Sequence, residues 1–249
     1  EDGAIEGGAD EEEEAIGCVV SGKGNKNKRE RFERFWERVI EQSKDGILFD
    51  DCLLAVLTSW LGALANFSAR ACRLTATVAA LQVARSLIDV AKELADTREK
   101  NARQKGSERR RSGEPSASSQ STKMRKLEEL SDQLESNAAA IDGAIEELFK
   151  NVVFVRYRDT AAEIRVHCIA ALAEFIAAWP ERLLADTYMK YVAWDLSDRN
   201  PEVRLAAVRG LQSIYAACGE SAPSALEKFT DRFKARIVQM SLDTHPAVA

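Results

Sequence analysis

The chain has 249 residues, of which 45% are hydrophobic, and its formal net charge is −5. This apolar content is sufficient for a sizeable core and excludes a chain that is disordered throughout. It contains five prolines and is rich in Ala, Leu, Glu, Arg and Lys, which favours an all-α fold.

The cysteines and the hydropathy pattern limit the class of protein further. The five cysteines are odd in number and include no CxxC or CxxH pair, which argues against a disulfide framework and a zinc site (Cys18, Cys52, Cys72, Cys168 and Cys218). No run approaches the roughly 18 apolar residues of a membrane span, and no signal peptide precedes the predicted folded part. We expect an intracellular protein in a reducing compartment, with no membrane partner, no metal and no cofactor. Because the chain starts at Glu1 and stops within an apparent helical unit, we also expect a fragment of a longer protein.

The N-terminal half is predicted to contain a tail, three helices and a helical hairpin. Residues 1–28 combine Gly with acidic residues and then Lys with Asn, which predicts a disordered tail. Apolar residues at helical spacing predict helices from residue 30, from about residue 50 to 65, and from about residue 70 past 95. Residues 104–122 are rich in Gly, Ser and Pro and predict a flexible loop. The leucines and isoleucines of residues 127–148 predict a long helix, which would form an antiparallel hairpin with the helix before the loop.

From residue 154 the sequence repeats itself. The segment Asp159 to Arg165 recurs as Asp198 to Arg204, and a degenerate copy starts at Asp243. The intervals of about 40 residues are typical of HEAT-type helical pairs, in which an Asp of one repeat pairs with an Arg of the next. We therefore predict an N-terminal region over residues 29–153 and stacked HEAT-like repeats over residues 154–249.

Local signals mark the ends of the helices in this region. Asn200 is a predicted helix cap, with Pro201 at the first helical position, and Pro180 is predicted to end the preceding helix. Thr160 with Glu163, like Ser224 with Glu227, has the spacing of a capping box.

Several ordered motifs resemble one protein family. Residues 154–215, with the series YRD, EIR, YMKYVAW and VRL, closely resemble the stromalin conservative domain of the SA/STAG cohesin subunits, and residues 226–243 continue the match. Upstream, the FW pair at Phe35, LFDD at residues 48–51 and RLTAT at residues 73–77 follow in the family's order. The chain departs from the family pattern at Leu74, where His is usual, at Ala193, where Gly is usual, and at Asp195, where Thr or a similar residue is usual.

The resemblance implies a function. Such subunits bind the kleisin of the cohesin ring, contact double-stranded DNA and recruit regulatory proteins. We therefore expect a non-catalytic scaffold that serves sister-chromatid cohesion and chromosome organisation in the nucleus. The alternative is a generic HEAT adaptor that binds only proteins and no DNA.

The predicted helix around Trp194 is the first candidate site. Helical spacing places Trp194 away from the apolar face and beside a charged stripe with Asp186 and Lys190. A Trp among polar groups suits a binding anchor, although another repeat could cover it as ordinary core. The resemblance implies a surface for aromatic peptide motifs of regulators, formed by Tyr157, Asp186, Lys190, Trp194, Arg232 and Phe233. Phe233 also fits a core position, because it shares a helical stripe with Leu226, Phe229 and Ile237.

The predicted hairpin tip is the second candidate site. Both arms carry basic residues to it, and these would neutralise DNA phosphates without reading bases (Arg103, Lys105, Arg109, Arg110, Arg111, Lys123, Arg125 and Lys126). The alternative is a solvated basic loop without a ligand. A further basic cluster over residues 23–38 is expected to contribute similarly.

Catalytic patterns find little support. The two histidines, His167 and His245, lie outside any HExxH or other metal-ligand spacing, and no phosphate-binding GxxxxGK[ST] loop occurs. His167 and Cys168 are adjacent on a predicted helix and point about 100° apart, which is unsuited to a nucleophile and its base. We therefore expect no enzyme activity.

Overall fold

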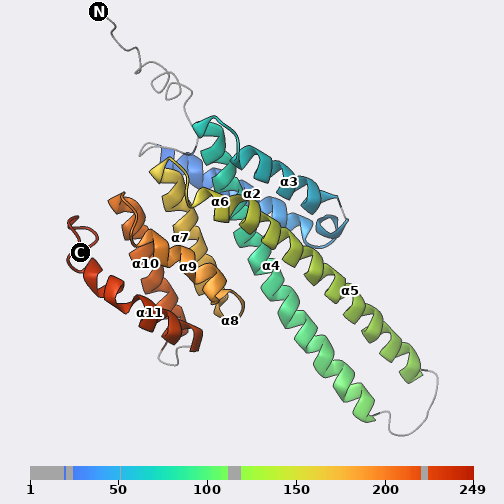
Figure 1. The fold of residues 1–249 in the computed structure, drawn as a ribbon. Helices are drawn as coiled ribbons and strands as arrows, with labels where there is room; N and C mark the ends of the chain where they lie inside the picture. The colour runs from blue at the N-terminus through green and yellow to red at the C-terminus, as the bar shows by residue number, and fades with distance from the viewer. Residues whose placement is uncertain (1–19, 21–24, 51, 112–118, 220–223) are drawn as a thin grey trace, which may run out of the picture.

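The computed structural model describes residue 20 and residues 25–50, 52–111, 119–219 and 224–249; at the ends of the 112–118 gap, the side chains of residues 111 and 119–121 are not described. Every regular element in these ranges is a helix (Figure 1). The helices form a stack from which one long hairpin projects, so the predicted all-α, helical-repeat fold is confirmed.

The N-terminal helices pack on the first half of a long helix. They are α2 (Lys26–Ser43), the 3₁₀ turn η2 (Ile47–Phe49) and α3 (Leu53–Ala65), and the long helix is α4 (Arg70–Arg111). Ile40 of α2 and Leu61 of α3 are buried where these helices contact α4, and the buried Leu48 of η2 packs on α2 and α3. The predicted end of the tail at residue 28 is wrong, because α2 begins at Lys26 and Val20 already lies in the core with 2% exposure. The rest of the predicted tail lies outside the described residues.

The hairpin consists of α4 and α5 (Ser119–Leu148), which run antiparallel as predicted (Figure 1). Leu127, Leu134, Ile141 and Leu148 of α5 are buried. The predicted loop over residues 104–122 is wrong at both ends, because α4 continues to Arg111 and α5 starts at Ser119. One Gly costs a helix only about 1 kcal/mol, and the Glu, Arg and Lys around Gly106 are good helix formers. Residues 112–118, the rest of that loop, lie outside the described residues.

The first half of α4 is apolar enough, by length and composition, to resemble a membrane span. Of the qualifying 18-residue window, 78% is buried within the protein. Contacts with α2, α3, α5 and α7 account for this burial, so the apolar stretch serves as the central core helix.

The C-terminal half is a stack of short helices. After the π-helical turn η3 (Phe149–Val153) and α6 (Phe154–Arg156) come α7 (Ala162–Ala178), α8 (Pro180–Leu183), α9 (Asp186–Asp195), α10 (Pro201–Cys218) and α11 (Ser224–Met240).

Pro180 ends α7 as predicted, and the side chain of Asn200 caps α10 by accepting a hydrogen bond from Glu202 N at 2.8 Å. The capping box predicted at Thr160 is wrong. Ala161 is the N-cap residue, and its amide donates to Asp159 Oδ1 at 2.8 Å.

Arginine–aspartate pairs join successive repeats, as the sequence repeat predicts. Arg165 donates from Nε and Nη2 to both carboxylate oxygens of Asp198, each at 2.8 Å. Arg204 binds Asp243 in the same way, at 2.7 and 2.6 Å. Two parallel hydrogen bonds fix the mutual orientation of the partners, so each pair sets the register of one repeat on the next.

A third pair of this kind lies between Arg73 of α4 and Asp159, with Nε and Nη2 donating at 3.0 and 3.3 Å. In all three arginines Nη1 donates to the carbonyl of the residue six positions earlier, which for Arg73 is Phe67. The start of α4 is therefore a further repeat of the stack. The hairpin separates Arg73 from the next repeat arginine, Arg165, which hides this repeat in the sequence.

The aspartates of these pairs are held in the ionised form. For Asp159 and Asp198, burial alone would raise the pKa, but hydrogen bonds from Arg73 and Arg165 and from backbone amides lower it below the usual value. For Asp243, hydrogen bonds from Arg204 and from the backbone of His245 lower the pKa to about 2.

Gly210 of α10 lies at a close approach to α7. A Cβ atom built at Gly210 would lie 2.5 Å from Cβ of Ala173 on α7. Only glycine permits this contact, which brings the backbones of the two repeats together.

Candidate binding surfaces

Aromatic rings run without interruption from the core to the surface of the repeat stack. Phe149 stacks on Phe175 in the core, and Phe154 stacks on Tyr191 with ring centroids 4.6 Å apart. Tyr191 meets the edge of Trp194 at 5.4 Å. Trp194 ends this series with 46% of its surface exposed, so no described helix covers it as ordinary core.

Trp194 shares one face of α9 with the other predicted residues of that helix. Asp186, Lys190 and Trp194 follow each other at intervals of four residues, which aligns them along the helix. The ammonium of Lys190 lies 5.8 Å from the ring centroid of Trp194. The face therefore offers an aromatic surface with a cation above it.

Tyr157 supports this surface from below. It is 7% exposed, and its ring lies 6.1 Å from that of Trp194 with an interplanar angle of 27°. Burial raises the pKa of its hydroxyl above the ordinary value of 10. Tyr157 thus acts as a packing residue under Trp194 rather than as an exposed contact.

Arg232 and Phe233 lie on α11, near the other end of α9. Arg232 reaches Asp186 at 3.6 Å and also stacks on the Phe233 ring at 5.1 Å. Phe233 is half-buried beside Phe229, so its core interpretation is correct in part. The structure brings five of the six predicted residues to one side of the stack, and Tyr157 underlies that side.

Arg158 belongs to the same surface and was missed by the sequence analysis. Its guanidinium lies 4.9 Å from the centroid of the Tyr157 ring and 5.8 Å from that of Trp194. Trp194 is therefore approached by two cations, Arg158 and Lys190. Arg158 is the central residue of the YRD motif, but the motif indicates this role only once the fold has placed Tyr157 next to Trp194.

A second residue that the sequence analysis did not single out as a site is Asp195, next to Trp194. It is 5% exposed, and its Oδ2 atom has no hydrogen-bond partner among the described residues. Burial, and then the negative charge of Asp198, raise its pKa to about 7, although Arg165 opposes the shift.

At the hairpin tip, ion pairs already engage some of the predicted basic residues. Arg103 pairs with Glu99, Lys123 with Glu108 and Arg125 with Glu129. The remaining described cations form no ion pair among the described residues (Lys105, Arg109, Arg110 and Lys126). The side chain of Arg111 lies outside the described residues. The tip therefore keeps free positive charge on both arms.

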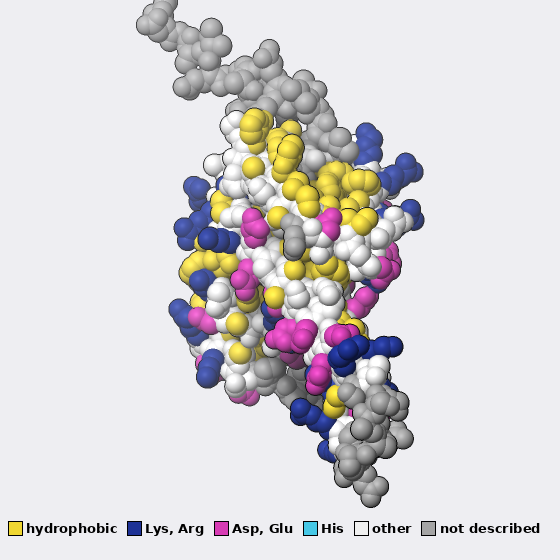
Figure 2. Space-filling view, turned by 90° about the vertical axis from the view of Figure 1, so that its right-hand side faces the viewer, with side chains coloured by type: hydrophobic (Ala, Val, Ile, Leu, Met, Phe, Trp, Pro, Cys, Tyr) yellow, Lys and Arg dark blue, Asp and Glu magenta, His cyan; other side chains and the backbone are white. Residues whose placement is uncertain are grey.

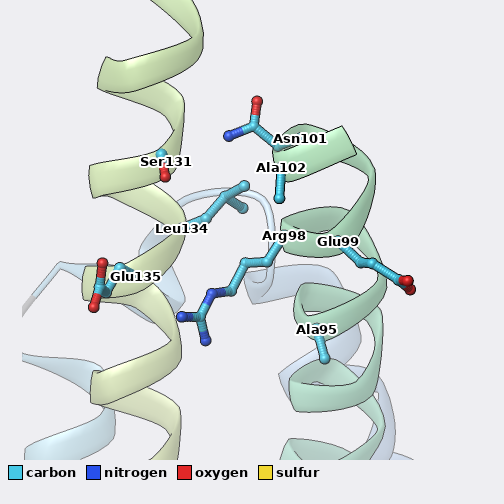
Figure 3. Close-up of a pocket in the computed structure, with 8 residues that line it drawn as sticks. All are labelled: Ala95, Arg98, Glu99, Asn101, Ala102, Ser131, Leu134 and Glu135. Atoms are coloured by element: carbon cyan, nitrogen blue, oxygen red, sulfur yellow. The ribbon is translucent and has the colours of Figure 1, made fainter. Parts of the chain in front are cut away.

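Near the tip the two arms enclose a cleft of about 370 Å³. Figure 3 shows the guanidinium of Arg98 extending from α4 toward α5 at the level of Glu135, whereas Asn101 and Ser131 lie further along the two arms. Asn101 is 4% exposed; its Nδ2 donates to Leu127 O at 3.2 Å, and its Oδ1 has no partner among the described residues. Packing between the arms is thus incomplete in this part of the hairpin.

The second predicted basic cluster, residues 23–38, lies on α2 from Lys26 onward, and residues 23 and 24 lie outside the described residues. Arg31, Arg34 and Arg38 are exposed along its outer face, where Phe35 is 55% exposed. Figure 2 shows Lys and Arg side chains beside a hydrophobic area at the upper end of the molecule, opposite the hairpin tip. Val56 and Trp60 of α3 are exposed apolar residues, and so is Phe67 in the connection between α3 and α4.

The geometry disfavours the cysteine–histidine pair as a catalytic group. Cys168 is fully buried, which raises the pKa of its thiol, and burial lowers the pKa of His167. Within the described residues, no three His, Cys, Asp or Glu side chains group closely enough to hold a metal ion.

These features define a helical-repeat protein with a projecting hairpin, an aromatic surface flanked by cations and a basic tip. Two family models match the chain. "STAG domain" covers residues 18–132 and "Stromalin conservative domain" covers residues 158–234.

Curated relatives agree with these matches. The chain is 34% identical to "Cohesin subunit SA-1" of Xenopus laevis over 96% of the chain and 19% of the relative. It is 32% identical to "Cohesin subunit scc-3" of Caenorhabditis elegans over 94% of the chain and 21% of the relative. The solved structure "Cohesin subunit Scc3 from Z. rouxii, 88-1035" superposes with a TM-score of 0.74 at 25% identity, over 86% of the chain and 23% of that structure.

The chain belongs to the stromalin (SA/STAG) family of cohesin subunits and contains the stromalin conservative domain. It spans about a fifth of the length of the curated relatives it matches.

Proposed function

We propose that this chain is the part of a cohesin subunit that binds regulatory proteins and DNA, and that it acts as a non-catalytic scaffold for the kleisin subunit. Sister-chromatid cohesion and chromosome organisation in the nucleus are the processes it serves. The exposed Trp194 carries the proposal, because a large aromatic that ends a rigid series of rings and lies under two cations is suited to anchor a partner.

The proposed peptide surface consists of Asp186, Lys190, Trp194, Arg232 and Phe233, supported by Tyr157. A partner would place an aromatic side chain against the Trp194 indole, where ring stacking and exclusion of water contribute most of the affinity. Trp194→Ala is expected to weaken binding of an aromatic peptide by about 2 kcal/mol or more. Trp60→Ala is the matched control, because Trp60 is 67% exposed on α3 and outside this surface. Equal losses in the two variants, measured by isothermal titration, would contradict the site.

The proposed DNA surface is the hairpin tip, with the outer face of α2 as a second basic area. Free cations on a convex tip contact phosphates rather than base edges, so binding of duplex DNA should be independent of sequence and weaken steeply with salt. Seven of the eight predicted side chains are described, and the four that form no ion pair among the described residues carry most of the contact: Lys105, Arg109, Arg110 and Lys126. Arg103, Lys123 and Arg125 contribute less, because nearby carboxylates offset their charge.

Fluorescence anisotropy at two salt concentrations tests the DNA surface. The double variant Arg109→Glu and Arg110→Glu is expected to lose most of the tip's duplex affinity. Arg209→Glu with Lys234→Glu changes the net charge equally on exposed residues of α10 and α11 and serves as the control. Equal binding by the tip variant and the parent would exclude the tip as a DNA site.

Pull-down of a kleisin fragment distinguishes the proposal from the alternative, a HEAT adaptor that binds other proteins and no DNA. Retention of the kleisin by the chain supports the cohesin role. Binding of aromatic peptides without retention of kleisin or DNA would favour the adaptor.

A further inference from the structure

Asp195 occupies an unusual position for a carboxyl group. It is the last residue of α9, follows Trp194 directly and is 5% exposed. The C-terminal end of a helix carries a partial negative charge, which disfavours a carboxylate there. Its Oδ2 atom is buried without a hydrogen-bond partner, so ionisation of this side chain leaves a poorly compensated charge inside the protein.

The groups around Asp195 do not neutralise it. On α7, Arg165 donates from Nε and Nη2 to Asp198 and from Nη1 to the Asp159 carbonyl, and Cys168 is buried with a raised pKa. Asp198, in the turn after α9, adds a like charge. Before α7 lies the buried Tyr157, and from α11 Arg236 donates to the Leu196 carbonyl at 2.6 Å. The described neighbours therefore include two arginines. Arg165 donates to other acceptors, as do both Nη atoms of Arg236, and Arg236 Nε is buried without a hydrogen-bond partner among the described residues.

Among the groups of this surface, Asp195 is the one whose protonation state changes near neutral pH. Burial and Asp198 raise its pKa to about 7. Tyrosine hydroxyls, lysines and arginines keep their protons between pH 6 and 8. A change of the surface in this interval would therefore trace to residue 195.

We propose that Asp195 is a proton-operated latch beneath the Trp194 surface. With the carboxyl protonated, the end of α9 packs against α7 and α10 and holds Trp194 in its binding position. Loss of the proton to solvent places a negative charge next to Asp198 and loosens the turn from α9 to α10. This displaces Trp194 and lowers the affinity for the partner. The effect on a partner rests on the proposed peptide site, whereas the loosening of the turn does not.

The direction of the pH effect follows from the raised pKa. In the unfolded chain an aspartate loses its proton near pH 4, and in the folded chain Asp195 does so near pH 7. The folded state therefore binds the extra proton between these values. The stability that this proton confers is present at low pH, declines as pH rises through that interval and is absent above about pH 7.

Binding and hydrogen exchange of the whole chain test the latch. The probe is an acetylated and amidated peptide with two aromatic residues and no His or Cys, so that its own charge stays constant between pH 6 and 8. For the parent, the Kd is expected to rise about tenfold from pH 6 to 8, because the protonated fraction falls by that factor. Asp195→Asn keeps the shape without the titration, and its Kd should match that of the parent at pH 6 and stay constant.

Amide exchange of residues 191–199 provides a readout that needs no ligand. At pH 8 these amides should exchange faster in the parent than in Asp195→Asn, and at pH 6 the two should agree. Asp89→Asn, an exposed position on α4, is the control and should behave as the parent.

Two outcomes separate the latch from the site on which it acts. If the peptide fails to bind at either pH while the exchange difference persists, the peptide site is wrong and the latch remains. If parent and Asp195→Asn share the same pH dependence in binding and exchange, the latch is refuted, whatever the affinity of the peptide.

Discussion

The repeat stack and the outer half of the hairpin both contain ion pairs between arginine and a carboxylate, but the pairs have different effects. In the stack, the side chains of the Arg165–Asp198 pair are 14% and 13% exposed. In the hairpin, those of Arg103 and Glu99 are 75% and 62% exposed. Buried, bidentate pairs fix how repeats are stacked, whereas exposed pairs mainly adjust the local charge. Burial, rather than the number of ion pairs, therefore determines whether a pair fixes the packing of neighbouring helices.

Acid should affect the stack more than any single substitution, because it acts on all three repeat aspartates. The folded pKa values of Asp159, Asp198 and Asp243 are lowered, that of Asp243 to about 2, so their stabilisation is complete above pH 4. As pH falls from 4 toward 2, the aspartates gain protons and the stack should lose stability. Chemical denaturation at several pH values measures the slope. A stability that stays constant over this interval would contradict the role of the pairs.

Removal of one buried arginine is the next largest expected effect. Arg165→Ala leaves the part-buried carboxylate of Asp198 without its two hydrogen bonds from Arg165 and should lower the free energy of unfolding by about 2–3 kcal/mol. Arg103→Ala in the hairpin should change it by less than about 0.5 kcal/mol. Similar losses in urea denaturation of the two variants would remove the distinction between the regions.

Gly210 tests the tight contact between α7 and α10. Gly210→Ala gains helix propensity but places a Cβ against that of Ala173, and we expect a net loss of about 1–2 kcal/mol. Adding Ala173→Gly removes the opposing Cβ and should restore part of the loss. If the double variant is less stable than Gly210→Ala alone, steric contact is not the cause.

The smallest expected effect concerns the cleft between the hairpin arms. Asn101→Leu removes the unpartnered Oδ1 and the bond to Leu127 O, while it adds apolar volume, so stability should stay within about 1 kcal/mol of the parent. Amide exchange of the outer halves of α4 and α5 should become slower. Faster exchange would show that Asn101 fixes the register of the arms.

Much of the fold could be predicted because it depends on local patterns. Helical spacing identified the helices and the antiparallel hairpin, and the recurring Asp and Arg identified two of the three pairs between repeats. The third pair was missed because the hairpin separates Arg73 from the rest of the repeat series. The Gly, Ser and Pro content of residues 104–122 predicts a loop that starts too early, because the helix formers around Gly106 extend α4 to Arg111.

The candidate site was less predictable, because tertiary packing forms it. The exposed side of Trp194 followed from helical spacing, but the burial of Tyr157, the position of Arg158 and the enclosure of Asp195 depend on the contacts of α7 and α11 with α9. An aspartate next to a charged stripe gives no sign in the sequence that its side chain points inward. Whether these residues bind a peptide stays a prediction.

The hairpin leaves the stack after the Arg73 repeat and returns before the next, so its length is independent of how the repeats are joined. Inserting seven residues into each arm, two helical turns, would move the tip outward by about 10 Å and keep every side chain on its original face. Related chains could thus differ in reach while retaining the same body. A graded set of such insertions would measure the distance between the repeat stack and the ligand that the hairpin tip contacts.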